Sequence, residues 1–161
     1  MLHFSDGDIY MIKSLDLKKL CEMAKASKLQ VELNDELIVW SLDENNEACL
    51  DLNDEGSVIN FTFISGAEVT SDDPNDLVLV NAINAAFVND GDLPSCSVCL
   101  DVYSDESDEE AIILRASQSL KGGVSEERIA DFFEDCQKAV EVMDSVIYGD
   151  GDVDDVDDDK E

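Results

Sequence analysis

The chain has no lysine and no arginine between Lys28 and Arg115, although that stretch carries 21 aspartate and glutamate residues. A surface built from such a stretch repels the phosphates of nucleic acids and of anionic lipids. It would instead attract a basic protein surface, a basic peptide or a metal cation. The missing positive charge therefore predicts a protein partner with a basic surface, and it argues against direct binding to nucleic acid or to a membrane.

Side chains that usually carry catalysis are also scarce. His3 is the single histidine and lies close to the first residue, so a catalytic triad or a histidine base is not expected. The carboxylates are numerous, but nothing in the sequence selects two of them as an acid and a base. We therefore predict no catalytic residues, no cofactor and no metal, and a protein that is not an enzyme.

The cysteines and the lengths of the apolar runs indicate the cellular compartment of the protein. The five cysteines, an odd number, are widely spread. No run approaches the apolar length that spans a bilayer, and Met1–Asp6 lacks the basic start and apolar core of a secretory signal. These features predict a cytoplasmic protein with reduced thiols.

One cysteine pair has the C-x-x-C spacing, Cys96 and Cys99, but it falls in an alternating segment. Residues three apart on a strand face opposite sides, and a zinc site would need two further ligands. We interpret both cysteines as structural.

What the sequence contains is enough for a folded domain. It has 161 residues, 44% of them hydrophobic, and a formal net charge of −30. A chain of this length buries roughly 70% of its unfolded surface, so we predict a single domain over residues 1–148. Residues 149–161 are rich in aspartate and are predicted to form a disordered acidic tail. High charge also keeps a small protein soluble, which is the simplest explanation of the acidity.

The spacing of apolar residues predicts an α+β fold with an antiparallel sheet of about five strands, in the order α-β-β-β-α-β-β-α. The first helix is expected from Ser14, its cap, to about Lys28, and three strands follow at 37–40, 47–52 and 58–64. The second helix starts at Pro74 and is apolar almost all round, which predicts burial on more than one side. Two strands at 95–103 and 111–120 precede a long amphipathic helix that reaches residue 148.

From residue 119 to residue 133 the chain reads SLKGGVSEERIADFF. This passage from a strand through a Gly-Val-Ser turn into an amphipathic helix resembles the YbjN-like family of small bacterial proteins. The asparagine-containing helix at 81–84 and the order of elements over residues 14–148 are similar too. The resemblance implies a type III secretion chaperone-like fold and a sensory transduction regulator that binds proteins without catalysis and can form a homodimer. It brings no active-site residues, and the acidic tail departs from the family pattern.

Three residues of this passage are predicted to form a structural junction. The glycine pair Gly122 and Gly123 permits a tight turn with positive φ, and Ser125 caps the helix that follows. A phosphate cradle at these glycines is disfavoured because the surrounding charge is negative.

These observations leave hypotheses from different classes. The leading one is a cytoplasmic regulatory or chaperone-like module that binds another protein through the outer face or an edge of its sheet. The alternative is an acidic inhibitor that mimics nucleic acid and occupies the site of a nucleic-acid-binding protein. A third is an enzyme acting on cationic substrates, which would require a concave site where carboxylates converge.

Overall fold

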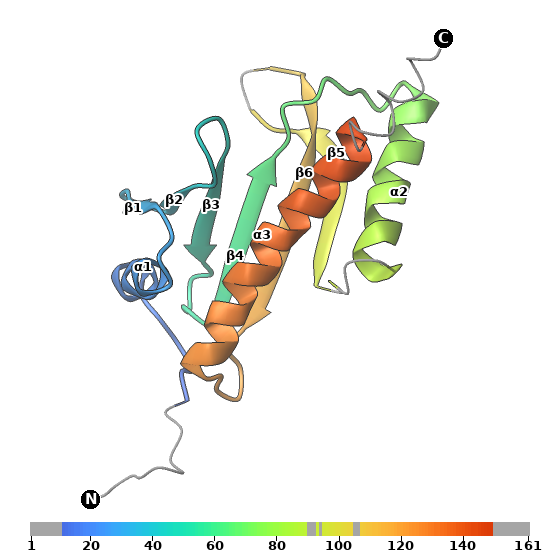
Figure 1. Ribbon diagram of the computed structural model, residues 1–161. Coiled ribbons are helices and arrows are strands. Elements are labelled where there is room, and N and C mark those ends of the chain that lie inside the picture. Colours follow the sequence, from blue (N-terminus) through green and yellow to red (C-terminus); the bar gives the residue numbers. More distant parts are fainter. Residues whose placement is uncertain (1–10, 90–92, 94, 105–106, 150–161) are drawn as a thin grey trace, which may run out of the picture. The chain divides into compact units, whose positions relative to one another are not determined.

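The computed structural model describes residues 11–89, 93, 95–104 and 107–149. Within these ranges it has an α+β architecture, with three helices and a sheet of six antiparallel strands in the order β1-β2-β3-β4-β6-β5 (Figure 1). The predicted class and order of elements are confirmed, with one strand more than expected.

The helices are α1 (Leu17–Ala26), α2 (Pro74–Asn89) and α3 (Glu126–Tyr148). The strands are β1 (Val31–Leu33), β2 (Ile38–Ser41), β3 (Glu47–Leu52), β4 (Val58–Ile64), β5 (Cys96–Val102) and β6 (Glu110–Ser119). None of the helices in the described ranges is both long enough and apolar enough to cross a lipid bilayer.

The chain forms two compact units. The first contains the residues up to Phe61 together with Ser117–Asp135, and the second contains Thr62–Ala116 together with the residues from Cys136 onward. The single domain expected over residues 1–148 stays a prediction. The predicted acidic tail begins at Gly149, and its residues 150–161 lie outside the described ranges.

Buried and more exposed side chains alternate along the strands of the first unit, and the buried ones form its core. Along β2, β3 and β4 every second side chain is buried: Ile38, Trp40, Ala48, Leu50, Ile59 and Phe61. The Trp40 ring makes edge-to-face contacts with Phe61 and Phe133, at centroid distances of 5.5 Å and 6.1 Å. Such pairs add about 0.5–1.5 kcal/mol beyond the burial of apolar area. The single tryptophan of the chain therefore lies at the centre of this unit.

Helix α1 is shorter than predicted at both ends. Asp16 rather than Ser14 is its N-cap, because the Asp16 side chain accepts a hydrogen bond from the Lys19 backbone N–H at 2.8 Å. A carboxylate at this position also complements the positive end of the helix. The helix ends at Ala26, and Lys28 adopts a φ of +69° that no α-helix can continue.

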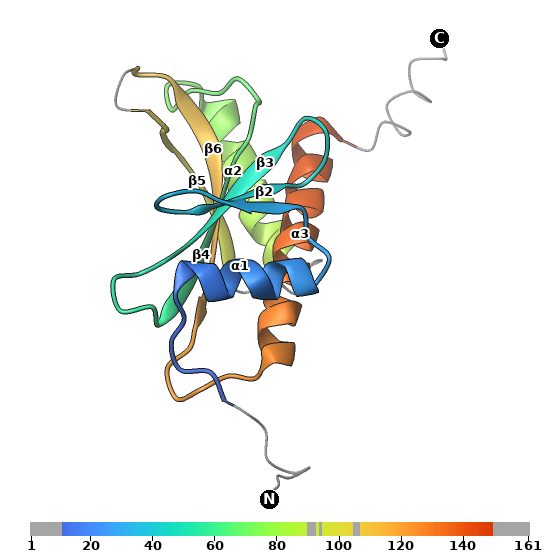
Figure 2. The same ribbon diagram turned by 90° about the vertical axis from the view of Figure 1, so that its left-hand side faces the viewer.

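The sequence pattern does not predict strand β1. Its Val31 pairs with Trp40 and its Leu33 with Ile38, so it extends the sheet beyond β2. Helix α1 packs beside it (Figure 2). A segment of three residues is too short to show a convincing alternation of apolar and polar side chains.

In the second unit, β5 pairs with β6 from Cys96 opposite Ala116 to Val102 opposite Glu110. Helix α2 runs alongside β5 (Figure 1) and buries Ile83 and Phe87 completely. The prediction that α2 is buried on more than one side is wrong. Its other side is accessible, with Val78 and Val88 exposed to 64% and 65%.

Candidate binding groove

The predicted junction residues set where α3 begins. Gly122 and Gly123 have φ angles of +81° and +90°, so the chain turns sharply after β6. The Ser125 hydroxyl oxygen accepts a hydrogen bond from the Arg128 backbone N–H at 3.1 Å. Val124 lies between these turns and exchanges two backbone hydrogen bonds with Ile12, at 2.7 Å and 2.9 Å. The junction therefore fixes the first turn of α3 against the segment that leads into α1.

Helix α1 presents two different sides in the first unit. Leu20, Cys21 and Ala24 are fully buried or nearly so, at spacings of one and three residues. Met23 falls between those positions and is only half-buried. It therefore lies on a side of α1 that the core does not cover.

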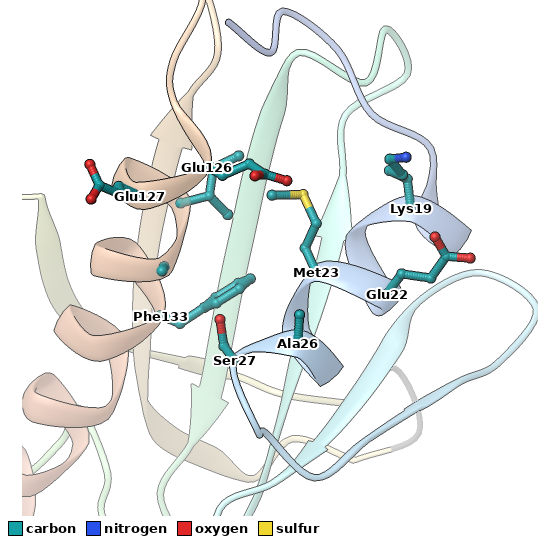
Figure 3. A pocket seen from close by; sticks show the side chains of 10 residues that line it. Lys19, Glu22, Met23, Ala26, Ser27, Glu126, Glu127 and Phe133 are labelled. Atoms are coloured by element: carbon teal, nitrogen blue, oxygen red, sulfur yellow. The ribbon is translucent and has the colours of Figure 1, made fainter. Parts of the chain in front are cut away.

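The first turns of α3 and the uncovered side of α1 enclose a groove with a volume of about 420 Å³. Its lining residues are Lys19, Glu22, Met23, Ala26, Ser27, Glu126, Glu127, Ile129, Ala130 and Phe133. We call this the α1–α3 groove. Figure 3 shows Met23 from α1 and Phe133 from α3 directed toward the space between the two helices. The Phe133 ring also touches Trp40, so the groove floor is continuous with the core of the unit.

The charges around the groove are mostly negative. Glu126 and Glu127 occupy the exposed first turn of α3, and Glu22 lies on α1. Lys19 is the one basic residue among the lining residues. A groove lined by apolar side chains and three glutamates suits a segment that carries apolar side chains beside basic ones.

The acids of the stretch between Lys28 and Arg115 lie mostly outside the strands. Of the 17 that lie in the described residues, five belong to strands: Glu32, Glu47, Asp51, Asp101 and Glu110. Arg115 itself lies on β6, where its guanidinium contacts the Cys99 sulfur at 3.5 Å. The strands therefore carry little of the charge, and the turns at their ends carry most of it.

One of these acids, Glu110, holds the loop that connects β4 to α2 in the second unit. Its carboxylate accepts hydrogen bonds from the Ser71 backbone N–H at 2.8 Å, from the Ser71 hydroxyl at 3.1 Å and from the Thr70 hydroxyl at 3.3 Å. The bonds from Ser71 and Thr70 lower the pKa of Glu110 below its usual value of 4.5. The carboxylate therefore acts as an anchor for this loop.

Beside this loop lies a depression of about 720 Å³ that includes Tyr103, Glu109 and Glu110. The Tyr103 hydroxyl donates a hydrogen bond to the Glu109 carboxylate at 2.7 Å, and this bond raises the pKa of Tyr103. A raised pKa keeps the Tyr103 hydroxyl protonated, and the Glu110 carboxylate is already bonded to the loop. His3 lies outside the described residues.

The cysteines have the structural setting expected of them. Cys96 is buried and Cys99 half-buried on β5, and they pair with Ala116 and Ile113 of β6. The pKa of a third thiol, that of Cys49, is raised by burial and, to a smaller extent, by the negative charges of Asp51 and Glu47. A raised pKa keeps the thiol protonated and unreactive. Within the described ranges no three histidine, cysteine or acidic side chains are grouped so that they could hold a metal ion.

No protein-family model and no curated protein matches the chain. YbjN from E. coli, a proposed transcription regulator, has a solved structure with 18% sequence identity and a TM-score of 0.63, which covers 86% of this chain and 96% of YbjN. An uncharacterized protein from Methanothermobacter thermautotrophicus has 12% identity and a TM-score of 0.52, with 83% and 98% covered. The chain thus has a YbjN-like fold. The likeness to type III secretion chaperones stays a prediction.

Proposed function

We propose that the protein is a non-enzymatic regulatory module that binds another protein by taking an apolar segment with flanking basic side chains into the α1–α3 groove. The observation that carries this proposal is the presence of accessible apolar side chains, Met23, Ala26 and Ala130, in the same groove as Glu22, Glu126 and Glu127. In a chain with a net charge of −30, a basic partner is also drawn in from a distance.

The proposal places the contact surface elsewhere than the sequence suggested. The outer sheet face and the sheet edges were expected to bind, but the strands carry few acids and the groove lies between two helices. Regulation follows from binding alone, because a segment held in the groove is not available to other proteins. We expect this binding to take place in the cytoplasm, which is the location predicted from the sequence.

A designed peptide tests the groove directly. The probe is an amphipathic helix without tryptophan, with leucines at i, i+3, i+4 and i+7 and lysines on its other side. Trp40 is the only tryptophan and its ring contacts Phe133 of the groove floor, so its fluorescence reports binding. A peptide of the same pattern with glutamate in place of lysine serves as the negative control.

Variants locate the binding site. Glu126→Gln with Glu127→Gln is expected to weaken the lysine peptide about tenfold, and Met23→Gln is expected to weaken it as well. The matched control, Glu36→Gln with Glu44→Gln, removes the same charge from exposed positions of the same unit and should have little effect. Binding should also weaken as salt is added. If both double variants weaken binding equally, the attraction is to the net charge of the chain and the groove is not the site.

A further inference from the structure

The depression beside the loop between β4 and α2 combines an aromatic ring, apolar side chains and carboxylates. Its volume of about 720 Å³ is in the range of pockets that hold small ligands. The side chains that give it this character are Ile64, Glu68, Val69, Tyr103, Glu109 and Glu110. We call it the Tyr103 hollow. All of its lining residues belong to the second unit, so it shares none with the α1–α3 groove.

The negative charge of the Tyr103 hollow has no counter-charge nearby in the sequence. Residues 62–114 contain no lysine and no arginine, and none lines the hollow. The carboxylate of Glu110 is bonded to the loop, and one oxygen of Glu109 accepts from the Tyr103 hydroxyl. Glu68 is exposed and its carboxylate has no partner among the described residues. Glu68 and the second oxygen of Glu109 are therefore available to a cation from outside the chain.

Ser65 is an independent sign that the hollow receives a ligand. Among the described residues it is the one polar side chain that is buried, at 5% exposure, and it lines the hollow. Its hydroxyl oxygen accepts a hydrogen bond from the Ala67 backbone N–H at 3.1 Å. The hydroxyl hydrogen finds no acceptor within the described ranges, and a buried donor without an acceptor is unfavourable. An acceptor oxygen that enters the hollow removes this cost.

The Tyr103 ring decides which cation fits best. Its side chain is 44% exposed, so the hollow offers an accessible aromatic surface. An arginine guanidinium is planar, weakly hydrated and stacks on aromatic rings, whereas a lysine ammonium is a compact and strongly hydrated charge. The guanidinium also has five N–H donors in a fork, enough for more than one carboxylate. An aromatic ring beside two available carboxylates therefore favours arginine.

We propose that the Tyr103 hollow binds an arginine residue of a partner protein. The guanidinium stacks on Tyr103 and pairs with Glu68 and Glu109, and a neighbouring backbone carbonyl oxygen accepts the hydrogen of the Ser65 hydroxyl. The arginine lies within a chain because its carboxyl group is then an uncharged amide, which the acids of the hollow do not repel. A single residue buries little area, so its dissociation constant is roughly 1 mM.

NMR titration of the full chain with N-acetyl-arginine amide tests the proposal. The backbone amide resonance of Ala67, which is bonded to Ser65, should shift and reach saturation. N-acetyl-citrulline amide has nearly the same shape without the charge and should bind at least about tenfold more weakly. Free arginine should also bind more weakly than the amide, because it brings a carboxylate. Equal binding of free arginine would overturn the assignment to an arginine within a chain.

Variants locate the arginine. Glu68→Gln should weaken the amide about tenfold, and its carboxylate has no bond within the fold to lose. Glu141→Gln is the matched control, because it removes the same charge from an exposed position of the same unit outside the hollow. It should leave the affinity within about twofold. Tyr103→Leu keeps an apolar side chain but loses the ring, and it should weaken the amide roughly threefold or more.

The role of Ser65 has its own test. Methylguanidinium carries the charge of arginine without a carbonyl oxygen. Ser65→Ala should therefore weaken the binding of N-acetyl-arginine amide roughly threefold or more, and leave that of methylguanidinium within about twofold. A variant that weakens both ligands equally would overturn the hydrogen bond from Ser65.

The arginine site and the proposed function can fail independently of each other. Glu126→Gln with Glu127→Gln changes the groove only, so it should not alter the binding of the arginine amide. The arginine site is overturned if the Ala67 resonance does not respond, or if the citrulline amide binds as well. It is also overturned if Glu141→Gln weakens binding as much as Glu68→Gln, because the attraction is then to the net charge of the chain.

Discussion

The side-chain amide of Asn84 pairs with the backbone of Val98 as a neighbouring strand would. Its Nδ2 donates to the Val98 carbonyl oxygen at 3.1 Å, and its Oδ1 accepts from the Val98 N–H at 2.8 Å. Strand β5 stands at one end of the sheet order, so Val98 has a partner strand on one side only. One asparagine of α2 therefore satisfies both backbone groups of an edge residue and attaches the helix to the strand.

Replacing this asparagine should destabilise the fold. Asn84→Ala leaves the N–H and the C=O of Val98 without these partners in a partly buried place, which costs about 1–3 kcal/mol of unfolding free energy. Asn81→Ala is the control, because Asn81 lies on the same helix but is exposed. It should change stability by less than about 0.5 kcal/mol. Urea denaturation measures both, and equal effects would contradict the role given to Asn84.

The two junction glycines should differ in their tolerance of a side chain. An alanine at either position adopts a positive φ, which costs about 1–2 kcal/mol. At Gly123 the added Cβ would also lie 2.8 Å from the Met11 Cβ, whereas at Gly122 it meets no atom within 4 Å. Gly123→Ala should therefore cost about 1–3 kcal/mol more than Gly122→Ala. Urea denaturation of the two variants decides this, and indistinguishable losses would count against the described geometry.

The loop between β4 and α2 should respond to acid through Glu110. Its hydrogen bonds with Ser71 and Thr70 lower its pKa in the folded chain below the usual 4.5. A lowered pKa means that the stabilisation is complete above 4.5 and is lost as the pH falls through the folded value. The amide resonance of Ser71, followed by NMR, should titrate with a midpoint below 4.5. In Glu110→Gln, which keeps an acceptor oxygen, this titration should vanish; if it persists, another acid controls the loop.

The Phe133 ring belongs both to the core and to the floor of the α1–α3 groove. It is only 1% exposed and contacts Trp40, so Phe133→Ala should lower the unfolding free energy by about 3–5 kcal/mol. Phe133→Leu keeps most of the volume and should cost less than about 1.5 kcal/mol. Thermal unfolding monitored by Trp40 fluorescence compares the two variants. A small loss in Phe133→Ala would mean that the ring is not packed as described.

Local patterns were enough to predict most of the fold. Ile38 with Trp40, and Ile59 with Phe61, alternate clearly enough to reveal their strands and the face that each one buries. The first helix was misplaced because Ser14 and Asp16 are both good caps, and sequence alone does not rank them. The apolar run of α2 predicts burial all round, but a sequence shows only that a side chain is apolar and not whether anything covers it.

The candidate site was beyond prediction for a different reason. The α1–α3 groove joins residues 19–27 to residues 126–133, and only the folded chain brings them together. In the sequence, Glu126 and Glu127 are only two of many acids, and Met23 is one of four methionines. No local pattern marks a half-buried methionine as part of a groove.

The concentration of acids in turns bears on how unfolded copies of this chain behave toward each other. Strand β4 reads VINFTFI, seven uncharged residues of high β-propensity, and such segments are the ones that stack into aggregates. The acidic turns beside it act as gatekeepers, because they keep copies apart while a strand is still unpaired. That protection is electrostatic and ends where the carboxylates are neutralised, near the pI of about 4.1. Acid therefore exposes the chain to aggregation, and a falling pH also loosens the loop held by Glu110.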